Sequence, residues 1–144
     1  MRTRIAAACL LGFLLLAGRH DGAPLLAMAE QTTPPAAGRV FEMRTYYTHP
    51  GRLDALNKRF REHTTKLFKK HGMENVGYWV PADKPDVLVY ILAHASRQAA
   101  DASWAAFRTD PDWLKARGES EKDGPIVLKV ETVWLSATDY SALK

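Results

Sequence analysis

The chain has 144 residues, a formal net charge of +4 at pH 7 and a single cysteine, Cys9. Residues 1–29 contain three arginines and one aspartate, so the remainder carries a net charge of only +2 and has no long basic run. This charge distribution disfavours a nucleic-acid-binding function. Residues 30–144 lack cysteine, which excludes a disulfide and a thiol nucleophile from that part of the chain.

The N-terminal segment has the three features of a secretory signal peptide. Arg2 and Arg4 form a basic start, residues 5–17 are an apolar run too short to span a bilayer, and residues 27–29 (Ala-Met-Ala) form a small-residue cleavage motif. We therefore predict a signal peptide at residues 1–29 and a periplasmic or secreted mature protein without a stable membrane span. An uncleaved N-terminal anchor is the alternative. Residues 30–38 are polar and contain proline, which predicts a flexible tether before one domain at residues 39–144.

Residues 40–72 predict one strand followed by one amphipathic helix. β-Branched and aromatic residues alternate along the sequence up to Thr48, and Pro50 is well placed to start a helix. Apolar residues then recur at helical spacing until Gly72, which supplies the stop. The helix positions with this spacing are Leu53, Leu56, Phe60, Leu67 and His71.

The rest of the domain predicts two strands, two helices and a final strand. Residues 73–81 and 86–95 are β-rich runs with a turn between them, which indicates an antiparallel hairpin. Ser96 is a good cap for a helix that ends near Thr109, and Asp110 with Pro111 starts a shorter one. A charged loop at 118–124 precedes the last strand, 126–135. The apolar anchors of the two helices are Ala100, Trp104, Phe107, Trp113 and Leu114.

The resulting order, βαββαβ, predicts an α+β ferredoxin-like fold with a four-stranded antiparallel sheet and helices on one face. The second face of the sheet then needs its own explanation, because the chain has no helices left to cover it. Contiguous apolar surface of this kind usually marks an interface.

The strands also predict which face holds polar residues. We assign the more apolar side of each strand to the helices: Phe41, Met43, Val87, Val89, Ile91, Leu128, Val130 and Trp134. The opposite face then collects Glu42, Arg44, Tyr46, Tyr90, His94, Lys129 and Glu131, with the apolar Leu88, Leu92 and Val133 among them and Tyr78 as a further candidate.

Buried charges need partners, so this polar face supports two readings. The structural reading is an ion network of Glu42, Arg44, Lys129 and Glu131. The functional reading is a ligand site, in which the planar fork of Arg44 holds an acidic or carbonyl-bearing compound. The accompanying ligand-binding side chains would be Tyr46, Tyr78, Tyr90 and His94.

Other site chemistries find little support in the sequence. His49, His63, His71 and His94 do not show metal-ligand spacing, since even the pair on one predicted helix is eight residues apart. Ser136 and Ser141 lack a nucleophile-elbow motif, and no glycine-rich phosphate loop is present. We therefore expect no metal and no cofactor.

The order of several short motifs resembles the NIPSNAP family over residues 40–143. The motifs are FEMRTY at 41–46, PGRL at 50–53, HG at 71–72, VGYW at 76–79, LAHASR at 92–97 and DPDW at 110–113. The resemblance implies a ferredoxin-like domain that pairs into a dimeric α/β barrel, and hence a homodimer. It brings no agreed catalytic residues.

Two classes of function remain at this point. One is a module that binds a small ligand or a partner. The other is a cofactor-independent oxygenase or isomerase acting on a small aromatic or carbonyl compound, which rests on analogy with the barrel superfamily. Turnover would need an acid or base beside the substrate, and His94, Tyr46 and Tyr90 could supply one.

Overall fold

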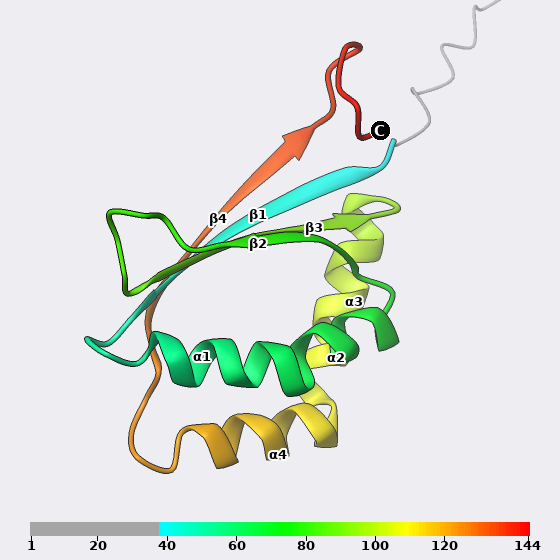
Figure 1. Cartoon of the computed structure of the whole chain (residues 1–144). Coiled ribbons are helices and arrows are strands. Elements are labelled where there is room, and N and C mark those ends of the chain that lie inside the picture. The colour runs from blue at the N-terminus through cyan, green and yellow to red at the C-terminus, as the bar shows by residue number, and fades with distance from the viewer. Residues whose placement is uncertain (1–37) are drawn as a thin grey trace, which may run out of the picture. The chain divides into compact units, whose positions relative to one another are not determined.

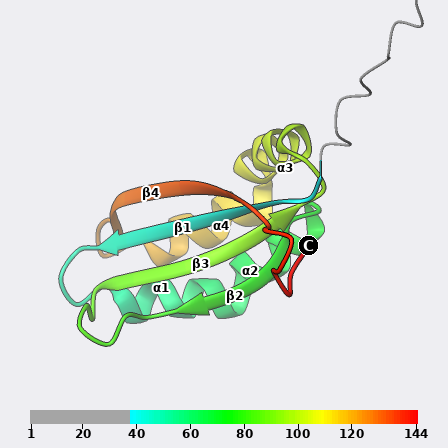
Figure 2. The ribbon, with the colours of Figure 1, turned by 90° about the horizontal axis from the view of Figure 1, so that it is seen from above.

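The structure, a computed structural model, describes residues 38–144. Four strands form one antiparallel sheet in the order β2-β3-β1-β4 (Figures 1 and 2). The strands are β1 (Val40–Thr48), β2 (Glu74–Trp79), β3 (Val87–His94) and β4 (Val127–Ser136). The predicted order of elements and the α+β ferredoxin-like fold are confirmed. The predicted signal peptide and nearly all of the tether lie outside the described residues.

The helices all lie on one side of the sheet (Figure 1). They are α1 (Leu53–Arg59), α2 (Thr65–Lys70), α3 (Arg97–Thr109) and α4 (Pro111–Ser120). No helix among residues 38–144 combines the length and the apolar character that a membrane crossing requires.

The first predicted helix contains a break in its hydrogen-bond pattern. A π-helical segment, η1 (Phe60–Thr64), separates α1 from α2, and the backbone N–H of Thr65 bonds to the carbonyl of Phe60, five residues earlier. The hydroxyl of Thr64 also donates to the carbonyl of Arg59, at 3.3 Å. Single π-helical turns of this kind occur often at functional sites.

The hydrophobic core lies between the sheet and the helices. Trp104 and Phe107 are buried there as predicted, but the predicted anchor Leu114 is 54% exposed, and Ala116 is the buried residue of α4. Phe60 and Phe68 make edge-to-face or tilted contacts with Tyr90 at the centre. The buried cluster consists of Leu53, Leu56, Phe60, Leu67, Phe68, Met73, Leu88, Tyr90, Leu92, Trp104, Phe107 and Ile126.

The predicted strand phase is wrong for β1 and β3. Tyr90, Leu88 and Leu92 belong to the helix-facing core, and Glu42 bonds to Trp104 of α3. The alternation of a strand then places Phe41, Met43 and Ile91 on the open face. The assignment of the more apolar side to the helices failed because the Glu42 carboxylate finds hydrogen-bond partners inside the core. The apolar residues instead gather on the face that the helices leave open.

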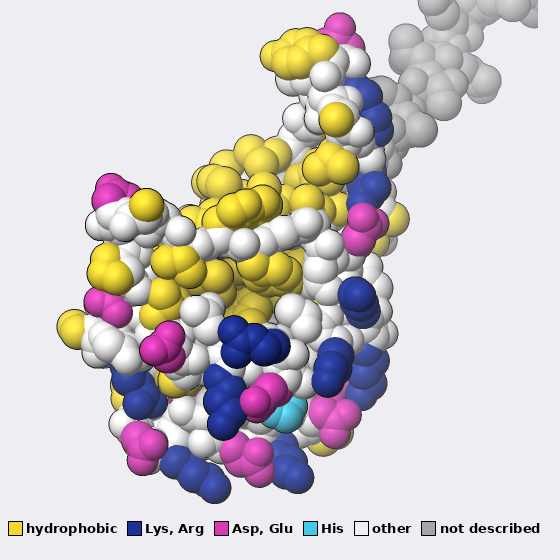
Figure 3. Space-filling model, viewed as in Figure 1, with side chains coloured by type: hydrophobic (Ala, Val, Ile, Leu, Met, Phe, Trp, Pro, Cys, Tyr) yellow, Lys and Arg dark blue, Asp and Glu magenta, His cyan; other side chains and the backbone are white. Residues whose placement is uncertain are grey.

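The open face is partly covered by the C-terminal segment. A cavity of about 310 Å³ lies beneath residues 136–143, against Phe41, Val76 and Ile91. Figure 3 shows hydrophobic side chains over the sheet, whereas charged side chains surround the helices. Val133, which pairs with Met43 in register, is 46% exposed on this face, as predicted for Val133.

Candidate functional site

A buried carboxylate, that of Glu42, is the centre of the polar cluster on the helix-facing side of the sheet. The side chain is 2% exposed and accepts three hydrogen bonds. Trp104 Nε1 and His94 Nε2 lie 2.7 and 3.0 Å from Oε2, and Arg44 Nη1 lies 3.0 Å from Oε1. Three donors compensate for the loss of water around this charge.

The strands and α3 position these groups. Glu42 and Arg44 are two residues apart on β1, so they share a face, and His94 is placed beside them by its pairing with Val40. The guanidinium of Arg44 lies 4.2 Å from the ring centre of Trp104, a cation–π geometry. One aromatic side chain of α3 therefore contacts both members of the ion pair.

Both members of this pair remain charged in the folded protein. Burial raises the pKa of Glu42, but the hydrogen bonds from His94 and Trp104 and the charge of Arg44 outweigh burial and lower that pKa overall. Burial acts to lower the pKa of Arg44, while Tyr46, Tyr90 and Glu42 raise it overall. The pair is thus a fixed dipole in the core.

Three tyrosines extend the cluster along the sheet. Tyr90 lies 5.3 Å from Tyr46 and is stacked on Tyr78 at 5.5 Å between ring centres. Burial raises the pKa of Tyr78 and Tyr90 above the usual tyrosine value, so both phenols are neutral. The Tyr78 hydroxyl donates to Asn75 Oδ1 at 2.5 Å.

The structure thus places all five residues predicted to bind a ligand on one face, although it is the helix-facing one. Three buried polar atoms of this set make no hydrogen bond to any residue in 38–144: Arg44 Nε, Tyr90 Oη and His94 Nδ1. Unpaired buried donors and acceptors of this kind are rare and call for a water, an ion or a ligand as partner. The ligand role of the five residues stays a prediction.

Lys129 and Glu131 do not join this cluster. Their ion pair, at 2.5 Å, lies on the open face with Tyr47, whose hydroxyl donates to Glu131 Oε2. The predicted four-residue network is therefore two separate pairs, Glu42 with Arg44 and Lys129 with Glu131. The prediction failed because the phase assigned to β1 is inverted whereas that assigned to β4 is correct, as the pairing of Tyr47 with Lys129 shows.

A cavity of about 350 Å³ opens beside the cluster, between β4 and α4, and Tyr46 forms part of its wall. Arg59, Trp113, Arg117 and Glu121 line its helical side. Sequence reasoning missed Arg59. The available signal was its position three residues after Leu56, which places an arginine on the apolar stripe of the helix.

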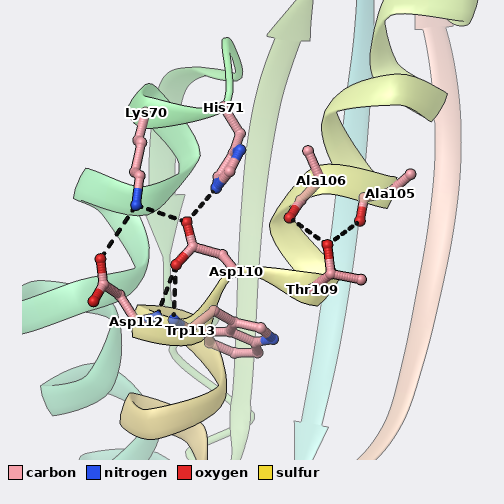
Figure 4. A network of polar contacts seen from close by, with 8 residues as sticks. All are labelled: Lys70, His71, Ala105, Ala106, Thr109, Asp110, Asp112 and Trp113. Atoms are coloured by element: carbon pink, nitrogen blue, oxygen red, sulfur yellow. Dashed lines mark hydrogen bonds and ion pairs between the residues drawn. The ribbon is translucent and has the colours of Figure 1, made fainter.

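A second polar cluster joins α2 to α4 (Figure 4). Asp110 caps α4 by accepting from the N–H of Asp112 and Trp113, and its other oxygen lies 2.7 Å from His71 Nε2 and 2.8 Å from Lys70 Nζ. The bonds from Lys70 and His71 lower the pKa of Asp110 well below its usual range. Because both of its carboxylate oxygens are hydrogen-bonded, Asp110 has a structural role and links α2 to α4.

Metal ligation finds no geometric support in the described part of the chain. Among residues 38–144, no three side chains of His, Asp or Glu come together as a metal ion would require. His49 and His63, whose spacing already argued against metal ligation, are not part of either polar cluster.

The four-stranded sheet with its helical layer defines a protein of the α+β, ferredoxin-like class, with a polar cluster between the layers. Within this class, residues 41–142 match the NIPSNAP family model, and the chain belongs to the NIPSNAP family. A comparison with curated proteins finds no match.

Solved structures agree with the fold. A NIPSNAP family protein of unknown function from Agrobacterium tumefaciens is 24% identical with a TM-score of 0.65, over 75% of this chain and 96% of its own. A NIPSNAP-like domain protein from Burkholderia xenovorans is 13% identical, with a TM-score of 0.64, and the match covers 73% of this chain and 90% of that protein. A Caulobacter crescentus protein, provisionally named an antibiotic biosynthesis monooxygenase, is 14% identical, with a TM-score of 0.53, and the match covers 72% of this chain and 93% of that protein.

Proposed function

We propose that this NIPSNAP protein binds a small acidic or carbonyl-bearing compound between the sheet and the helices, beside Arg44 and the tyrosines. The observation that supports this most is the set of three buried polar atoms without a partner, on Arg44, Tyr90 and His94. The cavity between β4 and α4 has Tyr46 in its wall, and Tyr46 in turn contacts Arg44 and Tyr90. The volume of this cavity falls in the range of small-ligand sites.

The test is the paired substitution Arg44→Lys and Arg44→Met. Lysine keeps a positive charge for Glu42 but lacks the Nε donor, so Arg44→Lys should remain folded and lose ligand. Arg44→Met leaves the Glu42 carboxylate with one partner fewer and should also melt at a lower temperature. Arg61→Met, at an exposed position in the π-helical segment η1 and away from Arg44, is the control.

Two measurements report on binding. Native mass spectrometry of protein from its own host identifies a retained molecule, and ligand-observed NMR with benzoate and 4-hydroxybenzoate measures binding of defined probes. If Arg44→Lys and the wild-type protein retain the same molecule and bind both probes equally, Arg44 takes no part in binding.

A cofactor-independent oxygenase or isomerase is the second candidate. The observation that favours it is the His94–Glu42 pair, in which the carboxylate orients the imidazole and leaves Nδ1 without a partner. An oriented imidazole is the commonest general base. Oxygen consumption with dihydroxyaromatic compounds tests this candidate, and His94→Gln should abolish any rate above that of heat-denatured protein.

We propose further that a second copy of the chain covers the open sheet face. Exposed Val133 and Leu135 on this face, with Met43 beside them, form an apolar surface suited to a two-fold interface. Light scattering should give about twice the chain mass. Val133→Glu should yield a monomer, whereas Leu114→Glu, at a somewhat more exposed position on α4, should not. A wild-type monomer at micromolar concentration would contradict the dimer.

We also propose export with cleavage after Ala29, on the strength of the basic start, the apolar run and the Ala-Met-Ala motif. N-terminal sequencing of the exported protein should begin at Glu30. Recovery of intact Met1 in the soluble fraction would contradict export.

A further inference from the structure

Arg59 lies in the wall of the cavity between α4 and β4 and is an unusual side chain for a helix core. Its side chain is 3% exposed. Nη1 donates to Ser120 Oγ at 3.1 Å and to Glu121 Oε1 at 3.0 Å, while Nε is buried without a partner. Arg59 also directly precedes the π-helical segment η1, where the backbone hydrogen-bond pattern changes. A buried guanidinium beside a cavity, with a donor still free, is suited to bind an anion.

Positive side chains outnumber negative ones around the cavity. Glu121 bridges two guanidiniums, with Oε1 on Arg59 and Oε2 on Arg117 Nε at 3.2 Å. Lys129 also lines the cavity, but its ammonium pairs with Glu131 on the open face. Two cations therefore share a single carboxylate, and an excess positive charge remains.

Glu121 can leave this position, whereas Arg59 cannot. Glu121 follows the last residue of α4, and its side chain is 22% exposed, so its carboxylate can turn toward water. Arg59 is held by burial, by its contact with Ser120 and by the ring of Trp113, 5.2 Å from its guanidinium carbon. The site thus already holds a carboxylate group, supplied by the chain itself.

We propose that the cavity binds a small aromatic carboxylate, whose carboxylate replaces Glu121 on Arg59. The aromatic walls are Trp113 and Tyr46, which suit a planar ring. This inference rests on the proposed ligand-binding function, but it assigns recognition of the carboxylate to Arg59 in the cavity wall and not to Arg44, which does not line the cavity. Glu121 is then an internal competitor that occupies the anion position when no ligand is bound.

The experiment measures benzoate and neutral benzyl alcohol binding to the full chain by ligand-observed NMR. Glu121→Gln removes the competing charge, so benzoate should bind ~10-fold more tightly to this variant than to the wild-type protein, a change of one decade in Kd. Benzyl alcohol should bind both proteins equally. Arg59→Met should abolish the preference for benzoate, and Arg108→Met, on exposed α3 surface, is the matched control.

If Arg59→Met does not fold, Arg59→Lys provides the test. Lysine keeps the positive charge but lacks the planar guanidinium, so this variant should bind benzoate more weakly and benzyl alcohol as before. Equal binding of benzoate and benzyl alcohol to the wild-type protein and Glu121→Gln would overturn the carboxylate inference and leave aromatic ligand binding intact. Absence of binding by either probe to any folded variant would overturn both.

Discussion

The sheet carries two carboxylate–cation pairs with the same spacing and opposite surroundings. Glu42 and Arg44 are two residues apart on β1, and Lys129 and Glu131 are two apart on β4. The Glu42 side chain is almost fully buried, whereas the side chains of Lys129 and Glu131 are 60% and 46% exposed. Identical spacing therefore produced a core dipole on one face and a solvated pair on the other.

The difference shows that the surroundings set the energetic role of an ion pair. The Glu42 carboxylate has lost its water and depends on Trp104, His94 and Arg44. Glu131 keeps its water and gains little from Lys129, because exposed pairs are screened. Substitution should therefore reduce the stability of the protein much more at the buried pair than at the exposed pair, although the ions are in contact in both.

The largest expected effect is that of Glu42→Ala. Removing this carboxylate leaves Arg44 as a charge in the core without its partner, and breaking a buried pair typically costs ~3–5 kcal/mol. Glu131→Ala is the matched control and should leave the free energy of unfolding unchanged within experimental error. Urea unfolding followed by circular dichroism measures both. Equal losses for the two variants would show that Glu42 is solvated in solution.

Trp104→Phe should have a smaller effect of the same kind. Phenylalanine keeps an aromatic ring next to Arg44 but removes the Nε1 donor that lies 2.7 Å from Glu42. Loss of a hydrogen bond to a buried charge is worth about 1–3 kcal/mol. Phe107→Leu in the same helix tests packing alone. A Trp104→Phe variant as stable as the wild type would mean that the remaining two donors satisfy the carboxylate.

A more modest effect is expected in the pH dependence of stability, to which the buried Glu42 carboxylate contributes. The folded-state pKa of Glu42 lies below the unfolded value of 4.5, so folding favours the ionised form. The contribution of the ionised Glu42 to the free energy of unfolding is present above the unfolded pKa. It is lost as the pH falls through the folded-state pKa. Between about pH 6 and pH 3, Glu42→Gln should therefore lose less stability than the wild type. Asp110 and Glu131, whose pKa values are also lowered, remain in both proteins and cancel in the difference.

The smallest effect is expected from salt and from Lys129→Met. Raising the salt concentration to about 1 M shortens the screening length to roughly 3 Å, which weakens exposed pairs selectively. The difference in melting temperature between wild type and Lys129→Met, already small, should vanish in high salt. A difference that persists in high salt would show that the Lys129–Glu131 pair is not exposed to solvent.

Secondary structure was largely predictable because its signals are local. Asp110 and Pro111 were recognised as the start of α4, and the structure confirms the cap through the N–H groups of Asp112 and Trp113. The contact of Asp110 with His71 was not predictable, because 39 residues separate the two and no local pattern joins them. The π-helical segment was likewise missed, since its apolar residues still fit an α-helical stripe.

Local sequence patterns were sufficient to predict the order of elements, the α+β class, the family, and Arg44 and His94 as neighbours of Glu42. They did not predict the contact of Trp104 with Glu42 or the separation of Lys129 and Glu131 from this cluster. Alternation along a strand is a local property, so it correctly placed Glu42, Arg44 and Tyr46 together on one side. Which side meets the helices was decided only by the tertiary structure. Hydrophobicity could not settle that choice, because Trp104 and His94 supply the hydrogen bonds that make a charged face suitable for the core, and both come from elsewhere in the fold.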